Sequence, residues 1–219
     1  MNILSQIKYS KSSTKFDQLF YYDHVTEYPI ANIADFDWKT VLSSPESNSS
    51  KKTYNELIEV YNKSQQRSKQ QVDTIKKIDF NPNFYLLELL DRLNLKFPVD
   101  VFQEMYHISY PILVNVKNLF NRARPYQLAK LYDMDIDLIV TSTHHTPSYP
   151  SGHTFYTRLG CNIVQNDYPN LKNELNKIVN ITAECRILQG VHYRSDNTAS
   201  IVLADYLYNY LKQKLYGLK

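Results

Sequence analysis

The stretch Pro150-Ser151-Gly152-His153 stands where a loop turns into a predicted helix. Proline suits the first turn of a helix because its missing N–H would have no intrahelical partner there, and glycine lets a ligand approach the backbone closely. The unpaired N–H groups at a helix N-terminus attract anions, and a histidine follows at once to move a proton. The stretch therefore predicts an anion site at the start of a helix, although an ordinary loop-to-helix junction has the same residues.

Two further blocks flank this stretch. Upstream, Lys117 is followed after six residues by Arg124 and a proline. Downstream, Arg186 is followed after five residues by His192 and after three more by Asp196. The three blocks, KxxxxxxRP, PSGH and RxxxxxHxxxD, resemble the signature of the acid phosphatase and vanadium haloperoxidase superfamily, also called the type 2 phosphatidic acid phosphatase superfamily. The signature specifies eleven positions, and ten of them match, over a span from residue 117 to residue 196. The exception is a serine before the arginine of the third block, where this chain has Cys185.

The residue types in these blocks suit phosphoryl transfer. A phosphate monoester is a dianion near neutral pH, and its transfer depends on neutralising the three equatorial oxygens. Lys117, Arg124 and Arg186 supply three cations, two of them planar forks that match phosphate oxygens. Ser151 and the Gly152 N–H complete the predicted phosphate cradle. With three fixed charges, we expect no cofactor and no metal ion, with vanadate as an inhibitor.

One histidine must then attack phosphorus while another protonates the leaving oxygen. The residues alone leave open which histidine has which role. The resemblance implies that His192 is the nucleophile and forms a phosphohistidine, that Asp196 holds it in the right tautomer, and that His153 is the acid that later activates water. An aspartate before the last predicted helix could equally be a helix cap, and both readings can hold.

The chain predicts an all-α fold, a single-domain helical bundle with the active site between the helices bearing the three blocks. It has four glycines among 219 residues, which is few for a turn-rich β fold. We expect residues 1–52 to be an N-terminal extension and linker packed on the main body through Phe20-Tyr21-Tyr22 and Phe36-Asp37-Trp38. Residues 53–219 then form the phosphatase-like domain.

Apolar periodicity places the predicted helices. The ranges are 53–78 with a polar, solvated middle, 84–93, 101–108, 112–122 after a restart or kink at Pro111, 153–166, 170–189 and a last helix after Asp196. The last helix has an apolar stripe at spacings of three and four residues, made of Ala199, Val202, Leu203, Tyr206, Leu207, Tyr210 and Leu211. Lys117 and Arg124 are seven residues apart and are predicted to lie near one helix face. Arg122 matches no motif position and is assigned to the surface.

Three other side chains invite functional interpretations that we do not favour. His144 and His145 lie in the polar loop 141–148, within the segment 126–149 that we expect to shape substrate entry, and solvent exposure is favoured over metal ligation. Cys185 replaces the serine of the signature before Arg186, but it falls on the apolar stripe of its helix and is predicted to be a core residue.

Composition limits the partners. The formal charge is +3, with basic and acidic residues interspersed, and no nucleic-acid footprint is present. No apolar run approaches 18 residues and the start lacks a secretory signal, so no transmembrane segment is expected and a soluble, cytoplasmic protein is predicted. The two cysteines are expected to be reduced. Tyrosine-rich surfaces and the polar helix make a homodimer conceivable.

Three functions from different classes follow. The favoured function is a metal-independent phosphatase that hydrolyses small phosphomonoesters, an acid phosphatase-like hydrolase. The second is a vanadate-dependent haloperoxidase, in which the same residues would hold vanadate as a cofactor; such chains are usually much longer. The third is a non-catalytic protein that binds phosphate or a phospholipid headgroup, supported solely by the departure at Cys185.

Overall fold

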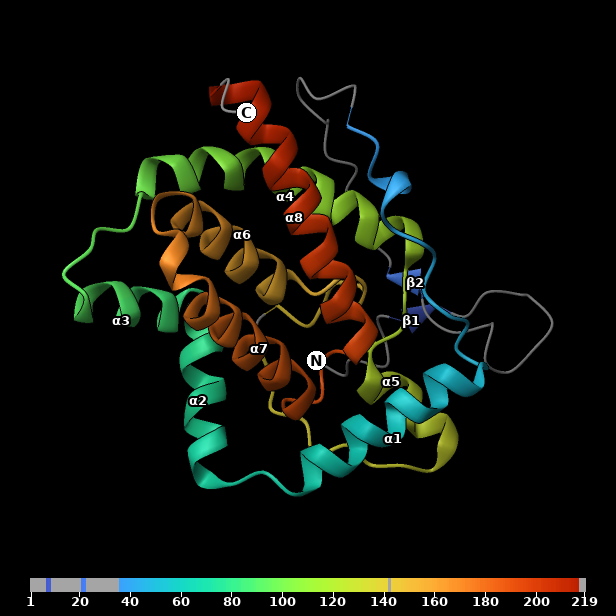
Figure 1. Cartoon of the computed structure of the whole chain (residues 1–219). Helices are drawn as coiled ribbons and strands as arrows, with labels where there is room; N and C mark the ends of the chain where they lie inside the picture. The colour runs from blue at the N-terminus through green and yellow to red at the C-terminus, as the bar shows by residue number, and fades with distance from the viewer. Residues whose placement is uncertain (1–6, 9–20, 23–35, 142, 217–219) are drawn as a thin grey trace.

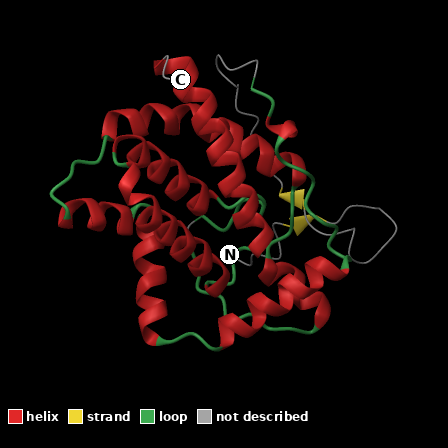
Figure 2. Cartoon of the chain, in the orientation of Figure 1, coloured by secondary structure: helices red, strands yellow, loops and turns green. Residues whose placement is uncertain are grey.

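The computed structural model describes residues 7–8, 21–22, 36–141 and 143–216. The described part is all-α apart from one short antiparallel pair, β1 (Ile7–Lys8) with β2 (Tyr21–Tyr22), in which Ile7 faces Tyr22 (Figure 2). The α-helices are α1 (Lys51–Gln65), α2 (Lys69–Phe80), α3 (Phe84–Arg92), α4 (Val99–Phe120), α5 (Pro125–Ala129), α6 (Gly152–Asp167), α7 (Lys172–Leu188) and α8 (Arg194–Tyr216). Short 3-10 turns cover Trp38–Thr40, Lys130–Tyr132 and Pro169–Leu171. None of these described helices is long and apolar enough to cross a membrane. The prediction of an all-α fold is confirmed.

Helix α6 forms the centre of the fold, with α7 and α8 packed against it and α4 along another side (Figure 1). Eleven of its 16 residues are buried, so it is covered on nearly every side. The largest core cluster joins α4, α6 and α8 and contains Phe155, Leu159, Leu203 and Leu207, none of which is exposed. Each such side chain stabilises the fold by about 1.5–3 kcal/mol. The helix that begins at the central motif is therefore the best-anchored element near the site.

The predicted apolar stripe of the last helix is confirmed. Ala199, Leu203, Leu207 and Leu211 are all buried. Val202, which the periodicity also placed on the stripe, is 39% exposed. Its position is one residue off the buried row, where the helix surface turns toward solvent.

The segment before α1 packs on the helices. The Phe36 ring lies 5.2 Å from the rings of both Tyr206 and Tyr210 on α8, and the Trp38 ring lies 5.7 Å from Phe120 of α4. Of the other expected anchor, Phe20 lies outside the described residues. The division of the chain at residue 52 stays a prediction.

The single helix predicted over 53–78 is wrong, because the chain turns between α1 and α2. Ser68 caps α2 in a capping box with Gln71, each side chain bonding the other's backbone N–H. The polar stretch is also not simply solvated. Arg67 donates to the Leu188 carbonyl (2.7 Å) and pairs with Asp137 (2.5 Å), and Ser64 is buried. These bonds hold the turn against α7.

Helix α4 continues through Pro111 and ends at Phe120, where Asn121 adopts a left-handed conformation (φ 41°, ψ 42°). The restart at Pro111 and the helix reaching residue 122 are therefore not observed. Arg124 instead precedes α5 in an extended conformation, as expected of a residue before proline. Lys117 and Arg124 consequently do not share a helix face, and the chain turn between them brings them together.

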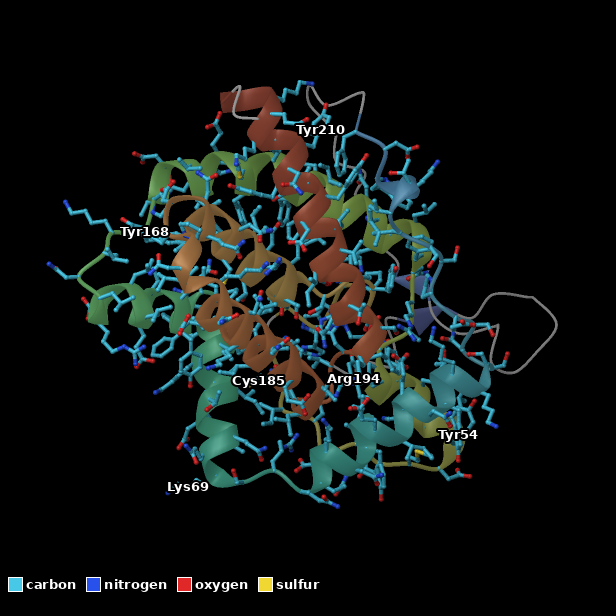
Figure 3. The ribbon with its side chains drawn as sticks, in the orientation of Figure 1. Tyr54, Lys69, Tyr168, Cys185, Arg194 and Tyr210 are labelled. Atoms are coloured by element: carbon cyan, nitrogen blue, oxygen red, sulfur yellow. The ribbon has the colours of Figure 1, made fainter. Side chains whose placement is uncertain are left out.

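Two features fix the turn from α7 to α8. Gly190 has a φ of +86°, which favours glycine, and it ends α7 as the sequence predicted. Arg194 lies at the start of α8 (Figure 3). It pairs with Glu59 of α1 and with Glu184 of α7, the latter at 3.2 Å. Cys185 is buried on α7, as expected of a core residue. The residues between α7 and α8, which include His192, are thus tied down on both sides.

Candidate active site

The three sequence blocks converge on one cavity of about 510 Å³. Five of the eight predicted site residues line it: Lys117 of α4, Arg124 before α5, Gly152 and His153 at the start of α6, and His192 after α7. The other three are buried behind this lining. Ser151 precedes Gly152, Arg186 of α7 pairs with the lining residue Asp79, and Asp196 of α8 contacts His192. The cavity thus lies between the helices that carry the blocks.

His192 is held at both ring nitrogens. Its Nδ1 lies 3.2 Å from Asp196 Oδ2 and its Nε2 lies 3.0 Å from Arg124 Nη1. Burial and then the Arg124 charge keep the pKa of His192 well below its usual value, against the opposing effect of Asp196. A neutral ring that donates from Nδ1 to Asp196 leaves a lone pair on Nε2, which accepts from Arg124. That lone pair becomes available to a ligand in the cavity once the bond from Arg124 is released, as it would be when an anion takes up the Arg124 N–H groups.

Asp196 is anchored from four directions. Besides His192, its carboxylate accepts from Arg122 Nη1 (2.6 Å), Ser148 Oγ (2.5 Å) and the Tyr193 N–H (2.9 Å). Burial would raise the pKa of Asp196, but the Arg122 guanidinium and the bond from His192 outweigh it and hold the pKa well below the usual range. Helix α8 begins at Arg194, so Asp196 lies in its first turn and not before the helix as predicted. From there its carboxylate bonds back to the Tyr193 N–H, as the third residue of a capping box does, and orients His192 as well.

Arg124 and Lys117 are buried cations with backbone partners. Arg124 donates to the carbonyls of Thr146 (2.9 Å) and Val191 (2.9 Å), and Lys117 donates to the Pro147 carbonyl (2.8 Å). Burial and then the Arg124 charge lower the pKa of Lys117 well below its usual value. These carbonyls orient the two side chains but carry no charge to balance them, so the cavity favours a negatively charged ligand.

Arg186 and His153 meet at Asp79, a residue that the sequence did not single out. Arg186 Nη1 donates to Asp79 Oδ1 (3.0 Å), and His153 Nε2 lies 3.8 Å from the same oxygen and 3.4 Å from the Asp79 carbonyl. Two other buried nitrogens of Arg186, Nε and Nη2, have no hydrogen-bond partner among the described residues. Unpaired buried donors of this kind are costly unless a ligand accepts from them.

The pKa of His153 depends on burial and on the charges of Arg186 and Asp79. Burial and then the Arg186 charge lower the pKa of His153 to about 3, against the opposing effect of Asp79. His153 is therefore neutral at neutral pH while the cavity is empty. A bound phosphate dianion beside the ring would favour the imidazolium and raise this pKa.

Helix α6 begins at the PSGH stretch as predicted, but the place of Pro150 differs from the prediction. Ser151 is the N-cap, so Pro150 stands before the helix and not in its first turn. The Ser151 hydroxyl makes no capping bond and lies 3.2 Å from Thr154 Oγ1. The first N–H groups of α6 accordingly have neither an intrahelical partner nor a side-chain cap, which suits an anion.

Packing does not demand glycine at position 152. A Cβ placed there would meet Leu113 at 3.7 Å, an ordinary contact, and alanine is the better helix former. We therefore expect Gly152→Ala to leave the midpoint of urea unfolding unchanged or higher. The affinity for inorganic phosphate, measured by calorimetry, should fall because the added methyl group stands where the ligand approaches. Unchanged phosphate affinity would remove Gly152 from the cradle.

Arg122 was assigned to the surface, and this prediction is wrong. Its side chain is 2% exposed and bridges Asp196 of α8 and Glu56 of α1 (3.1 Å). Its guanidinium carbon lies 4.1 Å above the Tyr193 ring. An arginine two residues before Arg124 offered a weak signal, but both acidic partners lie more than 60 residues away in the sequence. Arg122 is a buried partner of Asp196 and not a solvated charge.

The two histidines of the polar loop differ in their exposure to solvent. His145 is exposed, as expected, whereas His144 is buried and its Nδ1 bonds the Thr141 carbonyl, so its predicted exposure is wrong. The Tyr126 ring, 5.7 Å away, and the loop itself cover it. Among the described residues, no group of three or more histidine, cysteine, aspartate and glutamate side chains could hold a metal ion. The segment 126–149 also contains most of α5, so it is not a simple loop.

No family model matches the sequence, and no curated protein matches it. A solved structure does match: the crystal structure of the first transmembrane PAP2 type phosphatidylglycerolphosphate phosphatase from Bacillus subtilis. The similarity covers 78% of this chain and 90% of that chain, with a TM-score of 0.55 and 15% sequence identity. The chain has the fold of a PAP2-type phosphatase. The superfamily resemblance seen in the three blocks is therefore confirmed at the level of the fold.

The fold explains how three blocks that are separated in the sequence meet at one cavity. The blocks sit at the ends of α4, α6 and α7, and these ends meet at the cavity. The helices around α6 set the distances between them. The fold alone does not assign a reaction, because function resides in the site.

Proposed function

We propose that this protein is a phosphatase that hydrolyses phosphomonoesters through a phosphohistidine at His192, without a metal ion. The observation that carries the proposal is the state of His192. Its ring is buried and neutral, with Nδ1 bound to Asp196 and Nε2 beside the Arg124 guanidinium. A nitrogen nucleophile next to a phosphate-binding cation is the arrangement that phosphoryl transfer requires.

The surplus of buried positive charge supports a dianionic ligand. Arg122 is offset by Asp196 and Glu56, and Arg186 is partly offset by Asp79. Lys117 and Arg124 bond mainly to neutral carbonyls. A phosphate dianion would accept from these cations and from the unpaired Arg186 nitrogens. It would also raise the depressed pKa of His153, so binding should be accompanied by proton uptake at that ring.

The proposed reaction has two steps. His192 Nε2 forms a bond to phosphorus while the bond between phosphorus and the ester oxygen breaks, and the His153 imidazolium gives its proton to that oxygen. Neutral His153 then takes a proton from water, whose oxygen attacks phosphorus. The bond to His192 breaks, and phosphate leaves. Asp196 keeps the Nδ1 proton of His192 in place throughout.

The structural neighbour, a phosphatidylglycerolphosphate phosphatase by its title, supports the phosphatase class of activity. A fold shared at 15% identity does not carry its substrate over to this chain. The finer assignment to phosphomonoesters rests on the cavity, in which one phosphate group can be surrounded by the cations and the start of α6.

The test is hydrolysis of an aryl phosphate in excess chelator, from acidic to mildly alkaline pH, with orthovanadate as inhibitor. We expect chelator-resistant turnover that vanadate inhibits, because vanadate mimics the trigonal-bipyramidal phosphoryl group. Loss of turnover on chelation, with recovery on adding a divalent cation, would contradict metal independence. Bromide oxidation with added vanadate and no ester hydrolysis would instead establish a haloperoxidase, and phosphate binding without either reaction a binding protein.

A further inference from the structure

The cavity extends beyond the cradle along one face of α4. Phe102, Tyr106, Tyr110, Leu113 and Val114 all line it, and we call these five residues the α4 wall. They recur at spacings of three and four residues, so they share one helix face. Lys117 follows on the same face, one turn after Leu113 and Val114. The wall therefore leads from solvent to a phosphate-binding cation.

The wall reaches the cradle itself. The Leu113 side chain lies 3.7 Å from the position of a Cβ on Gly152, so apolar carbon abuts the N-terminus of α6. A group esterified to a phosphate held there would meet this end of the wall first. The wall is thus continuous with the proposed reaction centre.

Aromatic rings make the outer part of the wall. The Tyr106 ring lies 4.7 Å from Tyr156 of α6, 5.9 Å from Tyr110 and 6.3 Å from Phe102. Tyr110 is 36% exposed, and Phe80, which also lines the cavity, is 91% exposed. Covering these rings with an apolar group would remove them from water, and this burial would favour binding of that group.

The size of the cavity exceeds what a phosphate group needs. A volume of about 510 Å³ falls in the range of roughly 300–1,000 Å³ typical of sites for whole organic ligands. Polar lining residues come from other segments: Asp79, Asn81, Asn83, Thr143 and Thr146. The cavity therefore has a polar side around the cradle and an apolar side on α4.

We propose that the α4 wall is a leaving-group subsite and that the substrates are phosphomonoesters of apolar alcohols. The proposal rests on the proposed phosphatase function. The apolar group, alkyl or aryl, lies along the α4 wall while Lys117, Arg124 and Arg186 hold the phosphate. Sugar phosphates and other polyol phosphates place several hydroxyl groups against this wall and are poorer substrates. Of the five wall residues, Tyr106 and Tyr110 alone carry a polar group that could replace the lost water.

The deciding experiment uses n-alkyl phosphates of increasing chain length. The leaving-group pKa is nearly constant along this series, so kcat/KM reports burial of the chain. We expect a rise of up to about fourfold per methylene until the cavity is filled. Propyl phosphate should exceed glycerol phosphate, which has the same number of carbons. Benzyl phosphate set against heptyl phosphate distinguishes an aryl from an alkyl preference.

A second measurement is independent of catalysis. The affinity of n-alkylphosphonates, which cannot be hydrolysed, should follow the same slope by calorimetry. A phosphonate slope without hydrolysis of any ester would uphold the subsite and overturn the proposed function. A flat series in both measurements would overturn the subsite, and ester hydrolysis with a flat slope would leave the phosphatase proposal standing.

Variants locate the subsite on α4. Tyr106→Ala should flatten the slope for chains long enough to reach it, and Tyr110→Ser, at a more exposed position, provides a second variant should the first fail to fold. Leu119→Ala is the matched control, because Leu119 lies on the same helix, is 60% exposed and does not line the cavity. An unchanged slope in Tyr110→Ser and in folded Tyr106→Ala would place the apolar group elsewhere.

Discussion

Replacing His192 with alanine should lower the turnover of an aryl phosphate by about 10⁴-fold or more, because the proposed nucleophile is lost. The fold should survive. Asp196 keeps its bonds to Arg122, Ser148 and the Tyr193 N–H in the variant, so its carboxylate is not left unpaired. Circular dichroism and urea unfolding would verify this. The matched control is His145→Ala, an exposed histidine outside the cavity lining, which should retain wild-type turnover.

Covalent trapping separates the roles of the two histidines. Quenching the wild type during turnover of a radiolabelled aryl phosphate should yield an acid-labile, alkali-stable phosphoenzyme, the behaviour of a phosphorus–nitrogen bond. His192→Ala should give none. His153→Ala should still be labelled by an ester with a good leaving group, because such a group needs no proton, and the label should accumulate because water is no longer activated. Labelling lost in His153→Ala and kept in His192→Ala would reverse the two roles.

Local signals in the sequence were sufficient for most of the helices. The apolar rows of α8, the break at Tyr168-Pro169 and the stop at Gly190 each depend on residues close in the chain. The missed turn between α1 and α2 also had a local signal. Ser68 and Gln71 have the spacing of a capping box, but the polar stretch around them resembled a solvated helix face.

Long-range pairing explains what the sequence could not predict at the site. Arg122 is buried because Glu56 and Asp196 approach it from 66 and 74 residues away. Asp79 becomes part of the site because it lies in the last turn of α2 and pairs with Arg186, 107 residues later. A single charged residue has no periodic pattern, so the tertiary fold alone reveals such partners. The motif residues were found because their spacing was matched as a set.

Replacing Arg122 with methionine should destabilise the protein by about 3–5 kcal/mol at neutral pH, because the buried Asp196 carboxylate loses its closest counter-charge. Arg194→Met is the matched control. It removes an arginine that also pairs with α1, but from a side chain that is 50% exposed, so its cost should stay near 0–1 kcal/mol. Urea unfolding of both variants and the wild type measures the difference. Equal costs for the two variants would show that Asp196 does not depend on Arg122.

The cost of Arg122→Met should also depend on pH, in a direction fixed by the pKa of Asp196. That pKa is depressed in the folded wild type, so ionised Asp196 contributes stability above the ordinary carboxyl range, about pH 4, and this contribution is lost as the pH falls. Without Arg122, burial raises the pKa instead, and the carboxyl favours folding when protonated. The destabilisation should therefore be small in acid and grow as the pH rises through the carboxyl range.

Adding Asp196→Asn to Arg122→Met distinguishes the electrostatic cause from lost packing. The amide carries no charge to leave unpaired, so the double variant should regain part of the lost stability at neutral pH. It should remain inactive, because the amide lacks the negative charge that stabilises His192 and its NH2 group can donate to Nδ1, which favours the other tautomer. The single variant should keep some turnover, with the acidic limb of its kcat/KM profile moved to higher pH as Asp196 protonates more readily. Stability that is not regained, or an unmoved acidic limb, would mean that Arg122 merely fills space against the Tyr193 ring. The predicted pair of results instead makes Arg122 the residue that keeps Asp196 ionised, and through it keeps His192 in the nucleophilic tautomer.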